Sequence, residues 1–109
     1  MLDKRTFYIN GAWVAPIDGR DIDVIDPSTE EPCAVISLGG KADSDAAVAA
    51  ARAALPGFMA TKPAERLALV KRILEVYQRR NDEMGAAISL EMGAPIDMAK
   101  TSQSGSGTW

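Results

Sequence analysis

Ser37-Leu38-Gly39-Gly40-Lys41-Ala42, residues 37–42, is where the character of the chain changes. Before the two glycines, the segments are short, rich in β-branched and aromatic residues, and interrupted by turn residues. After them, the segments are rich in alanine and leucine, and apolar residues recur at helical spacing. The sequence therefore predicts an α+β chain with strands over residues 1–39, helices over residues 40–101 and a tail over residues 102–109.

Two pairs of short antiparallel strands are predicted before the glycines. Asn10 and Gly11 accept the positive φ angles of a tight turn, so residues 7–9 and 12–14 are predicted to form a β-hairpin. Residues 21–25 and 33–38 form the second predicted pair. Residues 26–32 between them are predicted to be a loop, because Pro27 lacks an amide donor and the following residues favour turns.

Three to four helices are predicted after the glycines. The first begins near residue 42 and ends or frays at Pro56-Gly57, and the second starts at Pro63. The third is capped by Asn81 and stopped by Gly93 and Pro95. Their apolar stripes are predicted to be buried, and they consist of Val48, Ala51, Leu55 and Phe58; of Leu67, Val70, Leu74 and Tyr77; and of Met84, Ala87 and Ile88.

Composition excludes several classes of function. The 109 residues carry a net charge of -3, which gives no positive patch for nucleic acid or for an anionic membrane. The chain has one cysteine, Cys33, and no histidine, so neither a disulfide framework nor a histidine-based metal or catalytic site is available. No apolar run reaches the roughly 18 residues of a membrane span or resembles a signal peptide, which predicts a cytoplasmic protein.

The motifs that suggest chemistry are better explained as structure. Gly39-Gly40-Lys41 lacks two P-loop features, because Val35 stands where a glycine is required and Ala42 where a serine or threonine is required. Cys33 starts an apolar strand without a nearby positive charge, which indicates a structural thiol rather than a nucleophile. The carboxylate pairs are predicted to be solvated, and they are Glu30-Glu31, Asp43 with Asp45, and Asp82-Glu83.

Five segments occur in a fixed order along the chain. They are Phe7-Tyr8-Ile9-Asn10-Gly11-Ala12-Trp13-Val14, Val24-Ile25-Asp26-Pro27-Ser28-Thr29-Glu30-Glu31, Ala49-Ala50-Ala51-Arg52-Ala53-Ala54, Pro63-Ala64-Glu65-Arg66 and Leu90-Glu91-Met92-Gly93-Ala94-Pro95. Together they resemble the amino-terminal portion of the NAD(P)-dependent aldehyde dehydrogenase family, from about residue 7 to about residue 97. The resemblance implies that the chain is a fragment of a larger α/β enzyme, truncated before its active site.

The resemblance also implies a function for the parent enzyme. Members of the family oxidise an aldehyde to a carboxylic acid with NAD or NADP, through a thioester on a cysteine. That cysteine, the general base and most of the cofactor pocket lie in later segments, so no catalytic or cofactor-binding residue is predicted here. The parent is expected to be a homo-oligomer that acts on a small aldehyde, and this chain alone is predicted to be inactive. The alternative is a non-catalytic module that binds a partner through exposed helix faces.

One binding site is carried over residue by residue from the resemblance. Many family members hold a monovalent cation, sodium or potassium, through two backbone carbonyls and an acidic side chain, and the matching positions here are Val24, Ile25 and Glu91. Uncharged carbonyl oxygens with one carboxylate suit a hard cation of single charge. The other interpretation is that Val24 and Ile25 simply continue a strand, and that Glu91 lies exposed near a helix end.

Overall fold

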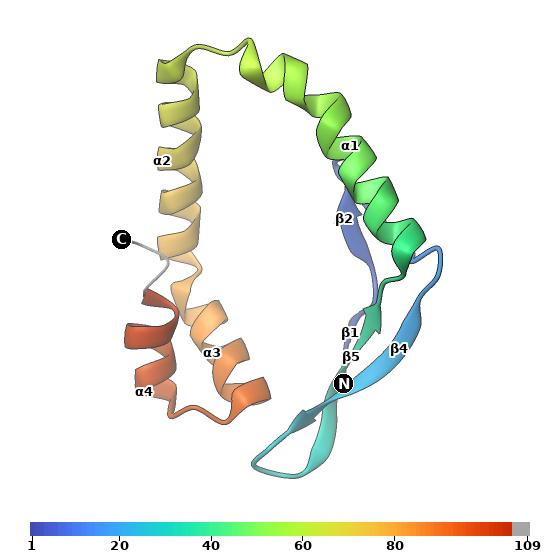
Figure 1. Ribbon diagram of the computed structural model, residues 1–109. Coiled ribbons are helices and arrows are strands. Elements are labelled where there is room, and N and C mark those ends of the chain that lie inside the picture. The colour runs from blue at the N-terminus through green and yellow to red at the C-terminus, as the bar shows by residue number, and fades with distance from the viewer. Residues whose placement is uncertain (106–109) are drawn as a thin grey trace. The chain divides into compact units, whose positions relative to one another are not determined.

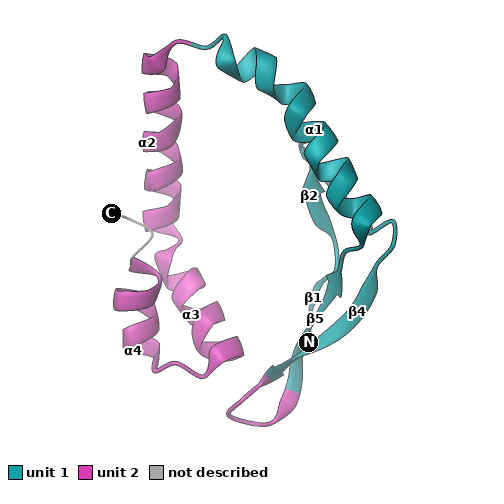
Figure 2. Ribbon diagram, in the orientation of Figure 1, with its two compact units in different colours: residues 1–25, 32–61 teal, residues 26–31, 62–109 magenta. Residues whose placement is uncertain are grey.

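The computed structural model describes residues 1–105, and it confirms an α+β chain in which strands come first and helices follow (Figure 1). The chain divides into two compact units, one of residues 1–25 and 32–61 and the other of residues 26–31 and 62–109 (Figure 2). The helical part ends at Gln103, two residues beyond the predicted end of the helices at residue 101. Residues 106–109 of that predicted tail lie outside the described part.

The predicted hairpin is confirmed. β2 (Phe7–Ile9) pairs with β3 (Ala12–Val14) in antiparallel register, with Tyr8 opposite Trp13. Asn10 and Gly11 adopt φ angles of 54° and 78°, which are the left-handed values that a tight hairpin turn requires. The rings of Tyr8 and Trp13 lie with their centroids 5.2 Å apart, so they form a cross-strand aromatic pair.

The first unit also contains a three-stranded sheet in the order β1-β5-β4. β4 (Arg20–Asp26) and β5 (Glu31–Leu38) are both longer than predicted, and β1 (Leu2–Lys4), which was not predicted, pairs in parallel with β5. Pro32 therefore lies in β5, although it was assigned to the loop. Because β1 pairs only with residues from Ala34 to Ile36, Pro32 has no neighbour on that side, and its missing amide donor is tolerated there.

Helix α1 (Lys41–Met59) continues through Pro56, where the sequence predicted an end or fraying. Proline removes an amide donor but keeps its carbonyl, and the carbonyl of Pro56 accepts a hydrogen bond from the amide of Ala60 at 3.1 Å. The predicted burial of the α1 stripe is wrong within this chain. Val48, Leu55 and Phe58 are 49, 50 and 49% exposed, so the described residues of the first unit do not cover this stripe.

The second unit begins with α2 (Pro63–Arg79) and α3 (Asn81–Met92), and its predicted apolar stripes are covered only in part. Leu67 and Val70 are 56 and 59% exposed, whereas Leu74 and Tyr77 are half-buried. On α3, Met84 is 45% exposed, Ala87 is exposed and Ile88 is half-buried. The buried residues of this unit lie where α3 meets α4 (Ile96–Met98) and the π-helix η1 (Ala99–Gln103); they are Gly85, Ala94, Ala99 and Ser104.

Side chains from α2 and α3 fix the π-helix. Asn81 was predicted to cap α3, but it is the first helical residue, and Nδ2 of its side chain donates to the carbonyl of Lys100 at 2.9 Å. The hydroxyl of Ser104 donates to the same carbonyl at 3.1 Å, and the Tyr77 hydroxyl donates to the Ser104 carbonyl at 2.7 Å. Backbone carbonyls in and just after the π-helix thus find donors on other turns, which stabilises this short element.

Candidate functional site

The turn after β4 is stabilised by Asp26, which is the last residue of that strand. The carbonyl of Asp26 accepts hydrogen bonds from the amides of Thr29 and Glu30 at 3.3 and 2.8 Å. Its carboxylate accepts one from the amide of Ser28 at 2.8 Å. Aspartate before proline commonly starts such a turn, because its side chain satisfies an amide two residues on. Glu30 completes the turn with a φ angle of 62°.

This turn packs against the end of α3 within the second unit. Gly93 ends the helix with a φ angle of 74°, and a Cβ atom there would lie 2.8 Å from Cγ of Pro27. Only glycine combines this left-handed angle with so close an approach. The hydroxyl of Ser89 also donates to the carbonyl of Ala94 at 2.8 Å, which fixes the chain as it leaves the helix. Gly93 is thus required by geometry, and the sequence correctly predicted that it stops α3.

The three predicted cation ligands lie on these two segments. Val24 and Ile25 are in β4 and belong to the first unit, whereas Glu91 is in the last turn of α3 and belongs to the second. Val24 is half-buried, Ile25 is 46% exposed and Glu91 is exposed. Because these residues belong to different units, the site that they would form stays a prediction. Within residues 1–105 there is no group of three or more histidine, cysteine, aspartate or glutamate side chains that could hold a metal ion.

Cys33 has a structural contact. Its thiol is half-buried and donates to the backbone carbonyl of Val24 at 3.3 Å, from β5 to β4. A thiol that bonds a backbone carbonyl across a sheet behaves as a small, weakly polar packing residue. This contact also places a donor next to one of the two carbonyls that are predicted to bind the cation.

Asp43 corrects one prediction, because it is not solvated. It is only 6% exposed, and its carboxylate accepts hydrogen bonds from the amides of Ile17 at 2.7 Å, Gly40 at 3.0 Å and Asp18 at 3.3 Å. These amides, that of Ile17 first, lower the pKa of the Asp43 carboxyl below its ordinary value. Asp45, two residues on, is exposed and pairs with Lys41 at 2.5 Å, as predicted for a solvated carboxylate.

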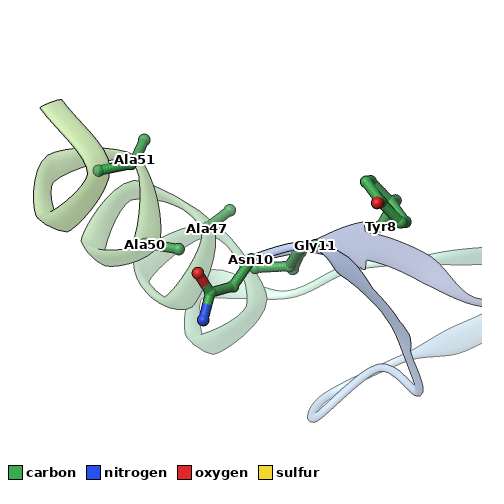
Figure 3. A pocket seen from close by; sticks show the side chains of 8 residues that line it. Tyr8, Asn10, Gly11, Ala47, Ala50 and Ala51 are labelled. Atoms are coloured by element: carbon green, nitrogen blue, oxygen red, sulfur yellow. The ribbon is translucent and has the colours of Figure 1, made fainter. Parts of the chain in front are cut away.

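A groove lies beside the hairpin, and the sequence analysis did not predict it. It is lined by Tyr8, Ile9, Asn10, Gly11, Ala47, Ala50, Ala51 and Ala54. Figure 3 shows the hairpin turn beside the alanine side of α1. Ala50 and Ala51 lie three and four residues after Ala47, and Ala54 lies three residues after Ala51, so this helical spacing was a readable signal in the sequence.

The comparisons with known proteins identify the family. The model of the aldehyde dehydrogenase family matches residues 13–107. A 3-succinoylsemialdehyde-pyridine dehydrogenase from a Pseudomonas species is 43% identical over 96 residues, which cover 88% of this chain and 20% of that protein. The chain thus spans about a fifth of the length of this curated relative, and it matches the amino-terminal portion of the enzymes.

Solved structures agree. The crystal structure of an aldehyde dehydrogenase from Bartonella henselae matches with a TM-score of 0.95 and 54% identity, over 99% of this chain and 23% of that one. Aldehyde dehydrogenase C from Pseudomonas syringae, solved as a mutant with NAD+ and octanal, matches with a TM-score of 0.85 and 46% identity, over 89% of this chain and 20% of that one. No helix within residues 1–105 is long and apolar enough to cross a membrane. The family model matches most of this chain, and the solved structures agree with that match. The chain therefore belongs to the aldehyde dehydrogenase family.

Proposed function

We propose that these residues serve as the amino-terminal part of an NAD(P)-dependent aldehyde dehydrogenase that oxidises an aldehyde to a carboxylic acid. The observation that carries the proposal is the match to the Bartonella henselae enzyme, which extends over 99% of this chain at 54% identity. Complexes of relatives with NAD+ and octanal support the same cofactor and substrate class. The proposal includes either NAD or NADP as the cofactor of the complete enzyme.

The chemistry of such an enzyme needs a reactive thiol that this chain does not supply. In the proposed reaction, a cysteine thiolate attacks the aldehyde carbon, a hydride leaves to the nicotinamide, and water hydrolyses the thioester. Cys33 does not take the role of nucleophile, since its thiol bonds a backbone carbonyl within a sheet. The role of this chain is therefore structural: its strands and helices support a site built by other segments.

We expect the isolated chain to show no dehydrogenase activity. Incubation with octanal and NAD+ should give no increase in absorbance at the NADH wavelength. A chimera supplies the matched control: the Bartonella henselae enzyme in which the matched segment is replaced by this chain. The chimera should fold and keep its kcat/KM within about tenfold of the parent. Activity of the isolated chain, or an unfolded chimera, would contradict the proposed function.

We also propose that the carbonyls of Val24 and Ile25 and the carboxylate of Glu91 bind a monovalent cation in the complete enzyme. The donor set is suitable, because it consists of oxygen atoms with one negative charge. The contact of Pro27 with Gly93 supports the proposal. Pro27 lies two residues after Ile25 in the sequence, and Gly93 lies two residues after Glu91. A carboxylate in the last turn of a helix is also disfavoured by the helix dipole, and a bound cation would compensate for this.

The cation site is tested by the stability of the chimera in different salts. We expect Tm to be higher by about 2–4 °C in potassium or sodium chloride than in choline chloride of equal ionic strength, because the ion binds only the folded state. Glu91→Gln should abolish this difference. Asp97→Asn is the matched control, since Asp97 is also exposed and lies in the next helix, and it should preserve the difference. Equal Tm values in all three salts for the unmutated chimera would refute the site.

Three further properties belong to the same proposal: a cytoplasmic location, a small aldehyde as substrate and a homo-oligomeric assembly. The assembly and the substrate class follow from the resemblance to the family, whereas the location is the prediction made from the sequence. Light scattering of the chimera tests the assembly, and a panel of aliphatic aldehydes tests the substrate class.

A further inference from the structure

The hairpin turn places an asparagine directly before a glycine. Asn10 and Gly11 are both exposed, and Figure 3 shows the Asn10 side chain with its amide group extended from the turn. Apart from its neighbours in the chain, no atom of residues 1–105 lies within 4 Å of a Cβ built at Gly11. Water therefore reaches the Asn10 carboxamide and the backbone that follows it.

Neither reactive group of this turn is held by a hydrogen bond. The cross-strand pairs end at Ile9 and Ala12, so the Gly11 amide lies outside the ladder. Within residues 1–105, neither that amide nor the carboxamide of Asn10 has a hydrogen-bond partner. The nitrogen of Gly11 and Cγ of Asn10 are thus close along the chain and unrestrained by hydrogen bonds.

Asn81 is the only other asparagine of the chain, and its setting differs in each respect. It is half-buried in the first turn of α3, and its Nδ2 donates to the carbonyl of Lys100 at 2.9 Å. Asp82 follows it, and an aspartate allows less backbone rotation than a glycine does. Asn81 therefore serves as an internal control for any chemistry of Asn10.

We propose that Asn10 is a site of spontaneous deamidation and isomerisation, for which water is the only co-reactant. The Gly11 nitrogen attacks Cγ of Asn10, the Cγ–Nδ2 bond breaks, and ammonia leaves with the proton of that nitrogen. Water then opens the cyclic imide at one of its two C–N bonds. Cleavage at Cγ gives aspartate, and cleavage at the main-chain carbonyl gives isoaspartate, whose main chain runs through Cγ. Neither step oxidises or reduces the chain.

The hairpin is held weakly enough to allow the rotation that ring closure needs. β2 and β3 have three residues each, and Trp13 is 70% exposed. A two-stranded sheet of this size is marginally stable, so it opens locally at little free-energy cost. The φ angle of 54° at Asn10 favours opening further, because a left-handed conformation is strained for a residue with a Cβ atom.

The two products differ in their effect on the hairpin. Aspartate keeps the turn, because Asp-Gly also adopts the left-handed angles of a type I′ turn. Isoaspartate adds one main-chain atom to the two-residue turn, so the register that places Tyr8 opposite Trp13 is lost. The reaction is independent of dehydrogenase function, since it uses only groups of this turn.

Ageing of the folded 109-residue chain in mildly alkaline buffer tests the proposal. Peptide mass spectrometry, with fragmentation that distinguishes isoaspartate from aspartate, follows each asparagine. Asn10 should react at least about tenfold faster than Asn81, and its rate should rise with pH because the attacking nitrogen must lose its proton. Equal rates at the two asparagines, or a product at Asn10 without isoaspartate, would overturn the proposal.

A comparison with the unfolded chain isolates the effect of the turn. In guanidinium chloride, Asn10 should react no more than about tenfold faster than in the folded chain, because the turn opens readily. Asn81 should gain more than that on unfolding, since it loses its helix and its bond to Lys100. A folded chain in which Asn10 is the more strongly protected of the two would refute the site.

Asn10→Gly is the matched variant, because Gly-Gly also suits the turn but lacks the carboxamide. Nuclear Overhauser contacts between the rings of Tyr8 and Trp13 report the register of the hairpin. On ageing, the unmutated chain should lose these contacts in proportion to its isoaspartate content, whereas Asn10→Gly should keep them. Equal loss in the variant would assign the change to another cause and contradict the predicted effect of isoaspartate.

Discussion

Asp43→Ala should lower the Tm of the isolated chain by about 10 °C, the largest effect that we expect from a single polar side chain. The substitution leaves the amides of Ile17, Gly40 and Asp18 without their acceptor. A buried donor that loses its partner loses more than the net strength of one hydrogen bond, because it has also been removed from water. The segment before β4 would then no longer be tied to the start of α1.

Asp45→Ala is the matched control for this prediction. Asp45 lies in the same turn of α1, but it is exposed and pairs only with the exposed Lys41. Exposed pairs contribute little, so Tm should change by no more than about 2 °C. Circular dichroism gives both Tm values, and hydrogen exchange of the Ile17 and Asp18 amides gives the local effect. Equal losses in the two variants would show that Asp43 acts only through the helix dipole.

The same carboxylate should make stability depend on pH. Its pKa in the folded chain lies below the ordinary value of 3.8, so the ionised form is favoured by folding. The stabilisation is therefore complete well above pH 3.8 and is lost as the pH falls through the lower pKa of the folded state. The urea midpoint of the unmutated chain should fall more steeply below that pH than the midpoint of Asp43→Asn. Parallel profiles would contradict this assignment.

Gly85→Ala should have the largest effect of any change in the second unit. A Cβ atom at Gly85 would lie 2.5 Å from Cγ of Lys100, 3.0 Å from its Cα and 3.1 Å from its amide nitrogen. The lysine side chain can move aside, but the backbone of the π-helix must shift as well. Overpacking of this kind costs about 1–3 kcal/mol, which exceeds the roughly 1 kcal/mol that alanine gains over glycine in a helix.

Gly57→Ala is the matched control, because it makes the same change at an open position of a helix. Apart from the nearby backbone of its own helix, no atom of residues 1–105 lies within 4 Å of a Cβ built at Gly57, so only the gain in helix propensity remains. This variant should be more stable than the unmutated chain, by about 0.5–1 kcal/mol. Urea unfolding measures both variants, and hydrogen exchange over residues 99–103 locates the damage. If Gly85→Ala were also stabilised, the close approach of α3 and η1 would be wrong.

Local signals in the sequence predicted the elements well. Asn10-Gly11 gave the hairpin because its left-handed turn is encoded in two adjacent residues. Gly93 correctly predicted the end of α3, because a left-handed residue at a helix end is also encoded locally. Pro63 correctly predicted the start of α2. In contrast, β1 is only three residues long and fully exposed, so its sequence has no apolar alternation. Its pairing with β5 depends on residues more than thirty positions away.

Burial was harder to predict than helix position. Periodicity shows which side of a helix is apolar, but it does not show whether another segment covers that side, and Val48 and Leu67 remain about half-exposed. Asp43 and Asp45 look alike in sequence, because both are acids in the first turn of a helix. The amides of the distant Ile17 and Asp18 and of the nearby Gly40 distinguish Asp43 from Asp45. The predicted cation ligands come from resemblance alone, since backbone carbonyls leave no mark in a sequence.

The parallel pairing of β1 with β5 has a consequence for synthesis on the ribosome. Leu2 lies opposite Ala34, so β1 has no partner in β5 until more than thirty further residues have left the exit tunnel. The β2–β3 hairpin needs only a two-residue turn, and such hairpins form within about 1–10 μs. Translation adds roughly 5–20 residues each second, so this gap lasts seconds. β1 is therefore incorporated later than the β2–β3 hairpin that follows it in sequence, and during that interval its edge is open to chaperones.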